Sequence, residues 1–549
     1  MNSLKPMLLT SLKSYNRTQF VKDVTAGIIV AIIALPLSIA LALASGVGPE
    51  AGIFTAIVAG FVISALGGSS VQIAGPTAAF ATIVAGIVAK DGLDGLVIST
   101  ILAGIFLILM GLCHFGSLIK FIPYTITTGF TSGIAVTIVI GQLKDFFGVT
   151  YPDGVKPIET TEKFKAFIEN ISTMNTAALI VGIVSLAILI ISPVIFKKIP
   201  GSLIAVIVGI LMVKFLPLKV STIGNLYTIS NSLPAFHLPA VNLHIIENAL
   251  PNAFTIAVLA AIESLLSCVV ADGMINGKHR SDMELVAQGA GNIASALFGG
   301  IPATGAIART AANIKNGGRT PVAGMVHSIT LVIVLVVLMP FAGMIPMPTI
   351  AAILFIVAYN MCQWRTFVHL IRTAPKSDII VLFATFILTI LFDLVVAIEI
   401  GMVLACLLFI KRMSEETHVD GWTYVDDDTP DVDAHLKKLP LQIRVYEITG
   451  PLFFHKLFHS FILPTIQKGC KVLFVVKDFT RCLVLRMRSV PAIDSTAMNA
   501  LFNLTKVCEN KGITLVFSHV NEQPMKVMEK AGFVELVGRE NFCPNISAA

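Results

Sequence analysis

Long apolar runs separated by short loops fill the sequence from residue 25 to residue 412, and they restrict this part of the chain to structures buried in a lipid bilayer. The whole chain is 55% hydrophobic and only 13% charged, values far from those of soluble domains. Several runs are shorter than the roughly 20 residues of a full span. We therefore expect a polytopic α-helical membrane protein of about 14 spans, some of them broken or re-entrant. The apolar runs are 25–44, 51–66, 72–89, 94–112, 122–141, 177–196, 201–217, 252–271, 285–298, 303–313, 321–340, 347–361, 378–395 and 397–411.

Loop charges predict the orientation of these spans. The first segment, residues 1–24, is polar and basic and lacks a small-residue cleavage site, so we expect an uncleaved cytoplasmic N-terminus. Lys and Arg gather in every second loop, whereas the opposite loops are acidic, mixed or nearly uncharged, which predicts an even number of spans with both termini in the cytoplasm. The net charge of +6 follows from these loops, so we expect no nucleic-acid partner. The basic loop residues are Lys120, Lys197, Lys198, Lys278, Arg280, Lys315, Arg319, Arg365, Arg372, Lys376, Lys411 and Arg412.

The character of the chain changes after Arg412. An acidic linker over 413–437 leads into residues 438–549, which have the pattern of a soluble domain. Runs typical of strands (LQIRVYEIT, CKVLFVV, ITLVFSHV) alternate with runs typical of helices (FHKLFHSFILPTIQKG, STAMNALFNLTKVCENKG, QPMKVMEKAG). This alternation predicts a small cytoplasmic α/β domain.

Two similar Gly/Pro breaks interrupt the apolar region. The first reads QIAGPTAAFATI near residue 75, and the second reads GGIPATGAIART about 227 residues later. Paired breaks at equivalent places in two halves indicate an inverted-repeat transporter with its binding site near the membrane midplane. Helix N-termini carry unpaired N–H groups and a partial positive charge, so two of them across a cavity predict an anion site.

The residues of the two breaks suit that role. Pro76 and Pro302 lack the N–H group that would be unpaired at a helix start, so we place them there. Thr77 and Thr304 can cap the helices or donate hydroxyl hydrogen bonds to a ligand. Four small residues would let the ligand approach the backbone closely: Ala78, Ala79, Gly305 and Ala306.

Two charged residues lie inside the apolar runs, where charge is costly. Arg309, roughly 7–8 Å along the second broken helix from Thr304, supports the anion electrostatically or, alternatively, pairs with backbone carbonyls or reaches the cytoplasmic interface. Glu263, about 18 Å past Pro251 on its own helix, can bind a proton or a cation and is the expected ion-coupling residue. Ser267 shares its helix face at i+4 and is expected to take part in ion coupling with it. The alternative for Glu263 is a structural pair with Arg309.

Several other functions find no motif in this chain. The sequence has no phosphate-binding G-x-x-x-x-G-K-[ST] loop and no G-x-G-x-x-G after a strand. Its eight cysteines lack metal-type pair spacing, and no nucleophile–base constellation stands out. We therefore expect no enzyme activity, no metal and no cofactor, and transport driven by ion or substrate gradients.

At this point the motifs support a resemblance. The order QIAGPTAAF, then AIESLLSCVVADGMINGKHRSDMELVAQGAGNIASALFGGIPATGAIART, then an α/β domain closely resembles the SulP/SLC26 anion transporters with a cytoplasmic STAS domain. The resemblance implies a seven-plus-seven inverted repeat within residues 25–412, with broken helices 3 and 10. It implies a core of spans 1–4 and 8–11 that moves against a gate of spans 5–7 and 12–14. It also implies a homodimer to which the STAS domain contributes assembly or regulation.

The same resemblance assigns residues and a substrate. Glu263 resembles the glutamate of proton-coupled members, which favours proton symport and leaves sodium open. The runs AIESLL, DGM-x-x-x-KH and ATGAIAR are most similar to a bacterial branch that imports C4-dicarboxylates across the inner membrane; bicarbonate and sulfate stay open as substrates, and a passive channel or a receptor as functions. The family's anion site falls on Pro76, Thr77, Ala78, Ala79, Phe80, Ala303, Thr304, Gly305, Ala306 and Arg309.

One motif in the C-terminal domain has two interpretations. PAIDSTAMNAL resembles a loop whose serine, here Ser495, is phosphorylated in anti-sigma-factor antagonists. A serine just before a helical run is also an ordinary N-cap, and we favour the cap because nothing else indicates a kinase partner. No cytoplasmic regulator is identified by the sequence.

Overall fold

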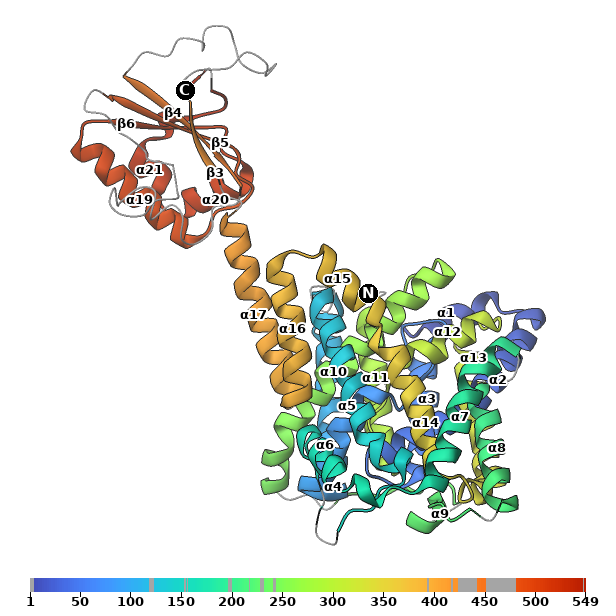
Figure 1. The fold of residues 1–549 in the computed structure, drawn as a ribbon. Coiled ribbons are helices and arrows are strands. Elements are labelled where there is room, and N and C mark those ends of the chain that lie inside the picture. The colour runs from blue at the N-terminus through green and yellow to red at the C-terminus, as the bar shows by residue number, and fades with distance from the viewer. Residues whose placement is uncertain are drawn as a thin grey trace. The chain divides into compact units, whose positions relative to one another are not determined.

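The computed structural model describes residues 4–117, 123–152, 155, 157–195, 200–216, 218–227, 232–239, 243–392, 394–415, 418–422, 442–450, 480–546 and 548–549 (Figure 1). It divides into two compact units, residues 1–402 and 403–549, which we describe separately. The predicted strand CKVLFVV and the predicted helix FHKLFHSFILPTIQKG lie outside the described residues, as do Lys120, Lys197, Lys198 and most of the linker.

Every apolar run of the sequence coincides with a helix. By length and composition, seven helices in the described part of the chain are able to cross a membrane. Runs 72–89 and 94–112 share one helix, which is interrupted at Gly92, where a φ of 72° suits glycine. The helices of the runs are α2 (Arg17–Ala44), α3 (Pro49–Leu66), α4 (Ala78–Leu112), α5 (Tyr124–Phe147), α7 (Thr176–Ile195), α8 (Gly201–Phe215), α10 (Leu243–Ile275), α11 (Ser281–Leu297), α12 (Ile307–Lys315), α13 (Val322–Ala342), α14 (Met347–Cys362), α16 (Lys376–Leu391) and α17 (Leu394–Glu415).

Further short helices are α1 (Met7–Ser11), which precedes α2, and α6 (Thr160–Glu169), α9 (Ile223–Leu226) and α15 (Trp364–Thr373), which lie between later helices in the sequence. The long helices pack in two groups. In the first, α2 packs on α3 and α13, α4 packs on α10 and α11, and α12 packs on α10 and α2. In the second, α5 packs on α14, α16 and α7, and α7 packs on α8.

Small residues allow the closest approaches in the first group. Gly104 of α4 and Gly289 of α11 face each other, so that a Cβ atom on either would collide with the carbonyl oxygen of the other. Such glycine contacts let helix backbones pack directly within a membrane protein, where apolar side chains gain little by leaving lipid.

In each break, a short extended segment precedes the start of the helix in the sequence. Strands β1 (Ala74–Gly75) and β2 (Thr304–Gly305) pair antiparallel, with Ala74 opposite Gly305 and Gly75 opposite Thr304. The prediction that Pro76 and Pro302 begin helices is therefore wrong, because α4 begins at Ala78 and α12 only at Ile307. The physical reason is that each extended segment satisfies its buried backbone groups with the other segment instead of with its own helix.

The second unit contains a five-stranded sheet in the order β3-β4-β5-β6-β7. Its first pair is antiparallel and the others are parallel. Leu485, Leu501 and Phe517 are fully buried in its core. The sequence did not single out β5. The elements of this unit are β3 (His418–Trp422), β4 (Ile443–Thr449), β5 (Cys482–Ser489), α19 (Ser495–Asn510), β6 (Thr514–Ser518), α20 (Glu522–Lys530), α21 (Phe533–Val537) and β7 (Phe542–Cys543).

The N-cap of α19 is Asp494, whose side chain accepts a hydrogen bond from the Ala497 N–H at 2.8 Å. Ser495 is the first residue inside the helix, so the expectation that it forms the cap is wrong. The reason is local: the carboxylate of the preceding residue already occupies the capping position.

Candidate functional site

The paired strands β1 and β2 place the starts of α4 and α12 side by side, and helix α10 holds this arrangement from one side. Ser264 of α10 hydrogen-bonds to the Thr304 hydroxyl at 2.8 Å and accepts the Gly305 N–H at 3.1 Å. The Ala306 N–H donates to the carbonyl of Ile73 at 2.9 Å, which adds a further link between the breaks. Two helix starts, each with a partial positive charge, are thus fixed close to one another.

Arg309, in the first turn of α12, crosses from the second break to the first. Its side chain is only 1% exposed, and Nη2 donates to the carbonyl of Pro76 at 3.1 Å and to Ser38 Oγ at 3.3 Å. A Cβ atom at Gly75 would collide with Nη1, so the glycine makes room for the guanidinium. Arg309 therefore does bind a backbone carbonyl, one of the two roles expected of it. Its Nε and Nη1 have no hydrogen-bond partner among the described residues, so the buried charge keeps donors for a ligand or for water.

Glu263 lies opposite the first break. Its Oε2 accepts a hydrogen bond from the Thr77 hydroxyl at 2.8 Å. Thr77 is the N-cap residue of α4, yet its side chain makes no capping bond and is instead committed to the carboxylate. Glu263 and Thr77 are half-buried, whereas the neighbouring Ala78 and Ala79 are buried, so this pair is the accessible part of the first break.

Glu263 does not pair with Arg309 within the described residues, so the two charges are available separately. Ser267, one turn beyond Glu263, donates to Thr310 Oγ1 of α12 at 3.5 Å and is buried. The Thr310 hydroxyl also accepts the Ile73 N–H at 3.1 Å. Ser267 thus lies next to the helix of the second break and beside the Glu263–Thr77 pair without joining it.

The structure brings the residues of the predicted anion site together from both breaks, although it does not give them equal access. Thr304 is fully buried and its hydroxyl is engaged by Ser264, so it is less available to a ligand than Thr77. The other buried members of the predicted set are Pro76, Ala78, Ala79, Phe80, Ala303, Gly305, Ala306 and Arg309.

Sequence reasoning missed a polar stripe on α11 that supports both breaks. The buried Glu284 carboxylate accepts the Gly68 N–H at 2.9 Å and the Gln72 amide at 2.8 Å, which fixes the segment leading into β1. Asn292, two turns later, exchanges two hydrogen bonds with Ala303, at 2.9 and 2.8 Å, just before β2. The signal was present, because Glu284, Gln288 and Asn292 are spaced by four residues and so share one helix face.

His327 of α13 is a second residue that the sequence analysis did not consider. It is fully buried, and in the described part of the chain neither ring nitrogen has a hydrogen-bond partner, while the Arg309 guanidinium lies within electrostatic range. A single histidine within an apolar run was the available signal.

Together, the apolar helices, the two broken helices and the buried cation between them define a membrane transport protein for small anions. The sulfate permease family model matches residues 20–385, and a STAS domain model matches residues 437–549. The chain therefore belongs to the sulfate permease family, the SulP/SLC26 anion transporters with a C-terminal STAS domain. Members of this family are transporters and not enzymes.

Named relatives cover most of the chain. YvdB of Bacillus subtilis, named as a candidate sulfate transporter, is 38% identical over 96% of this chain and 97% of its own length. The bicarbonate transporter BicA of Picosynechococcus is 32% identical over 79% of this chain and 78% of its own length. Among solved structures, the overall structure of SLC26A9 matches with a TM-score of 0.84 at 19% identity, covering 100% of this chain and 92% of that one, which shows the shared fold.

Proposed function

We propose that this protein is a secondary active transporter that couples uptake of a small anion to a proton through Glu263. The observation that carries the proposal is the hydrogen bond from Thr77 to Glu263, because it joins the carboxylate to the accessible helix start of the anion site. Protonation of the carboxylate would change the charge beside that helix start, so proton binding and anion binding would affect each other. Sodium binding by the carboxylate is the alternative form of coupling.

Three substrate classes fit the site. The names of the relatives suggest sulfate and bicarbonate, whereas the motif resemblance predicts C4-dicarboxylates such as succinate, fumarate and aspartate. No relative described above is named for dicarboxylates, so sulfate and bicarbonate now come first and the dicarboxylate prediction is retained as the third class. All three are anions that a buried guanidinium and two helix starts would attract.

The resemblance supports further parts of the proposal. It suggests a homodimer in a bacterial inner membrane, with both termini in the cytoplasm and a core that moves against a gate in alternating access. The domain limits that belong to it are 1–24, 25–412, 413–437 and 438–549. Light scattering of the purified protein and protease access to sealed vesicles would measure the oligomeric state and the orientation.

The test is uptake of labelled sulfate, bicarbonate, succinate and fumarate into proteoliposomes under imposed proton or sodium gradients. We expect proton-driven accumulation by the natural chain and its loss in Glu263→Gln, because the amide cannot exchange a proton. Substrate counterflow should survive in that variant, since the neutral side chain imitates the protonated carboxylate. Glu50→Gln removes a half-buried carboxylate from α3, away from the breaks, and should leave accumulation intact.

Other outcomes would contradict the proposal. Accumulation driven by a sodium gradient alone would show that sodium, and not the proton, is the coupling ion, and would leave the proposed anion site unchanged. Downhill flux that never accumulates substrate, in the natural chain and in Glu263→Gln alike, would identify a passive channel. Ligand binding with negligible flux would identify a receptor.

A further inference from the structure

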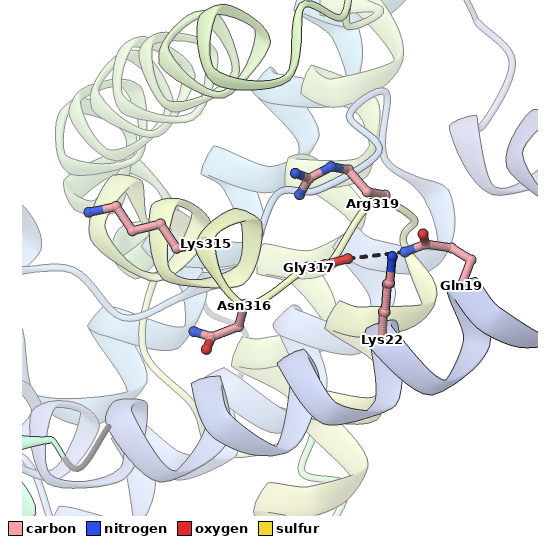
Figure 2. Close-up of a pocket in the computed structure, with 6 residues that line it drawn as sticks. All are labelled: Gln19, Lys22, Lys315, Asn316, Gly317 and Arg319. Carbon is pink, nitrogen blue, oxygen red and sulfur yellow. Dashed lines mark hydrogen bonds between the residues drawn. The ribbon is translucent and has the colours of Figure 1, made fainter. Parts of the chain in front are cut away.

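A basic pocket lies at the C-terminal end of α12, away from the two Gly/Pro breaks. It has a volume of about 550 Å³ and is lined by Gln19, Lys22, Lys315, Asn316, Gly317 and Arg319. Figure 2 shows that α2 contributes one wall, and that the end of α12 with the loop after it contributes the other. The Gln19 amide closes one side by donating to the carbonyl of Gly317 at 3.1 Å.

The lining is built for negative charge. Three of the six lining residues are cationic and none is acidic. Arg319 is held in place because its Nη1 donates to the carbonyls of Ile314 and Gly318, at 2.8 and 2.7 Å. Within the described residues, neither Lys22 nor Lys315 forms a salt bridge. The pocket also lies beside the first turns of α2, whose partial positive charge favours an anion.

Among the described residues, the buried Asp23 carboxylate forms no salt bridge with these cations. Asp23 is fully buried and accepts hydrogen bonds from the Thr320 hydroxyl at 2.6 Å, the Gln19 amide at 2.8 Å and the Arg319 N–H at 2.9 Å. It also accepts the Tyr15 hydroxyl at 3.1 Å. Burial and then the nearby Asp23 charge raise the pKa of Tyr15 to about 12, so the phenol stays a donor. Asp23 therefore acts as a structural acceptor that ties α2 to the loop after α12.

The surroundings of the pocket point to lipid. The pocket lies where two apolar runs end: the run of α2 begins at residue 25, just after Lys22, and the run of α12 ends at residue 313, just before Lys315. The end of an apolar run beside a cluster of cations is typical of the boundary between the bilayer core and its headgroups. Basic pockets at this boundary bind anionic headgroups.

We propose that this pocket binds a phosphate group carried by the headgroup of an anionic phospholipid. Such a lipid bridges Lys22 of α2 and Lys315 of α12. It therefore connects the helix that carries Arg309 to the membrane surface, and it stabilises the folded chain because it binds the native state.

The test is binding of a fluorescent phosphatidylglycerol to the purified full-length chain, with phosphatidylcholine as the uncharged comparison. We expect preferential binding of phosphatidylglycerol and a rise in Tm when it is added. The double variant Lys22→Gln with Lys315→Gln should bind it about tenfold or more weakly, because each lysine near an anionic lipid contributes substantially to the affinity. The control Arg372→Gln with Lys376→Gln removes the same charge from exposed positions elsewhere and should bind normally.

Three results would overturn the proposal. An equal loss of binding in the control would show bulk charge attraction only. If phosphatidylcholine bound with the same affinity as phosphatidylglycerol, the cations of the pocket would not be selecting an anionic headgroup. Displacement of the lipid by low millimolar inorganic phosphate would make a soluble anion the occupant. Anion uptake by the double variant in phosphatidylcholine liposomes should stay normal, so failure here is distinguishable from failure of the transport proposal.

Discussion

The two breaks are similar in sequence and differ in chemistry. Each has a Gly, a Pro and a Thr before a helix, and their strands pair with each other. In the first break the Thr77 hydroxyl is half-buried and donates to a carboxylate, whereas in the second the Thr304 hydroxyl is fully buried and pairs with a neutral serine. The partners, Glu263 and Ser264, are consecutive residues of α10.

This difference suggests a division of roles. The first break contacts the group that can change its charge, and the second carries the permanent cation, Arg309, whose guanidinium returns to the Pro76 carbonyl of the first. The features that the two breaks share form the paired strands. The features that differ place an ionisable carboxylate, Glu263, at the first break and a permanent cation, Arg309, at the second. The following predictions test this division, from the largest expected effect to the smallest.

Arg309→Ala should have the largest effect. The substitution removes the cation of the second break and leaves the Pro76 carbonyl without its donor. We expect KM for the anion to rise about tenfold to a hundredfold, because hydrogen bonds to charged groups contribute about 1.5–3 kcal/mol. Uptake kinetics in proteoliposomes would measure it, with Arg372→Ala, an exposed arginine of α15, as the matched control outside the site. Retained affinity in a folded Arg309→Ala protein would remove its role in anion binding.

Two glycine substitutions test the breaks against each other. A Cβ atom at Gly75 would collide with the Arg309 guanidinium, whereas a Cβ atom at Gly305 would collide with the side chain of Gln72. We expect Gly75→Ala to raise KM severalfold with a small change in Tm. Gly305→Ala should mainly lower Tm, because it disturbs the Gln72–Glu284 contact. The same profile for both variants would show that the breaks are equivalent.

Thr77→Val and Thr304→Val form the next pair, since both keep the side-chain shape and lose one hydroxyl. Thr77→Val removes the donor to Glu263, so the carboxylate should bind its proton more readily and the pH at half-maximal uptake should rise. Thr304→Val should leave that pH unchanged, because its partner is neutral. The test is to measure uptake as a function of pH for both variants. An equal shift of the pH at half-maximal uptake in both would contradict the division of roles.

Two serines of α10 give the smallest expected effects. Ser264→Ala removes two contacts of 2.8 and 3.1 Å to the second break and should lower stability by about 1 kcal/mol. Ser267→Ala removes one contact of 3.5 Å and should change stability little. Ser267 was nevertheless predicted to assist ion coupling. A changed ratio of protons to anions in Ser267→Ala would support that role, and an unchanged ratio would exclude it.

Particular residues show what sequence could predict. Each apolar run became a helix because burial of hydrocarbon is a property of the run itself. Arg309 and Glu263 were found because a charge within an apolar run is costly wherever it occurs. The helix starts were misplaced, since Pro302 precedes α12 by five residues. That error arose because strand pairing between two distant segments replaced the helical hydrogen bonds that the local sequence favoured.

The sequence by itself therefore determined that the chain crosses a membrane many times, that two helices are broken, and that one acid and one base lie within the apolar region. Only the tertiary structure decided which atoms meet: Thr77 with Glu263 across 186 residues, and Arg309 with Pro76 across 233. The physical reason is that hydrophobicity and backbone preference act locally along the chain, whereas a buried polar group needs a partner that only the packing of distant helices supplies.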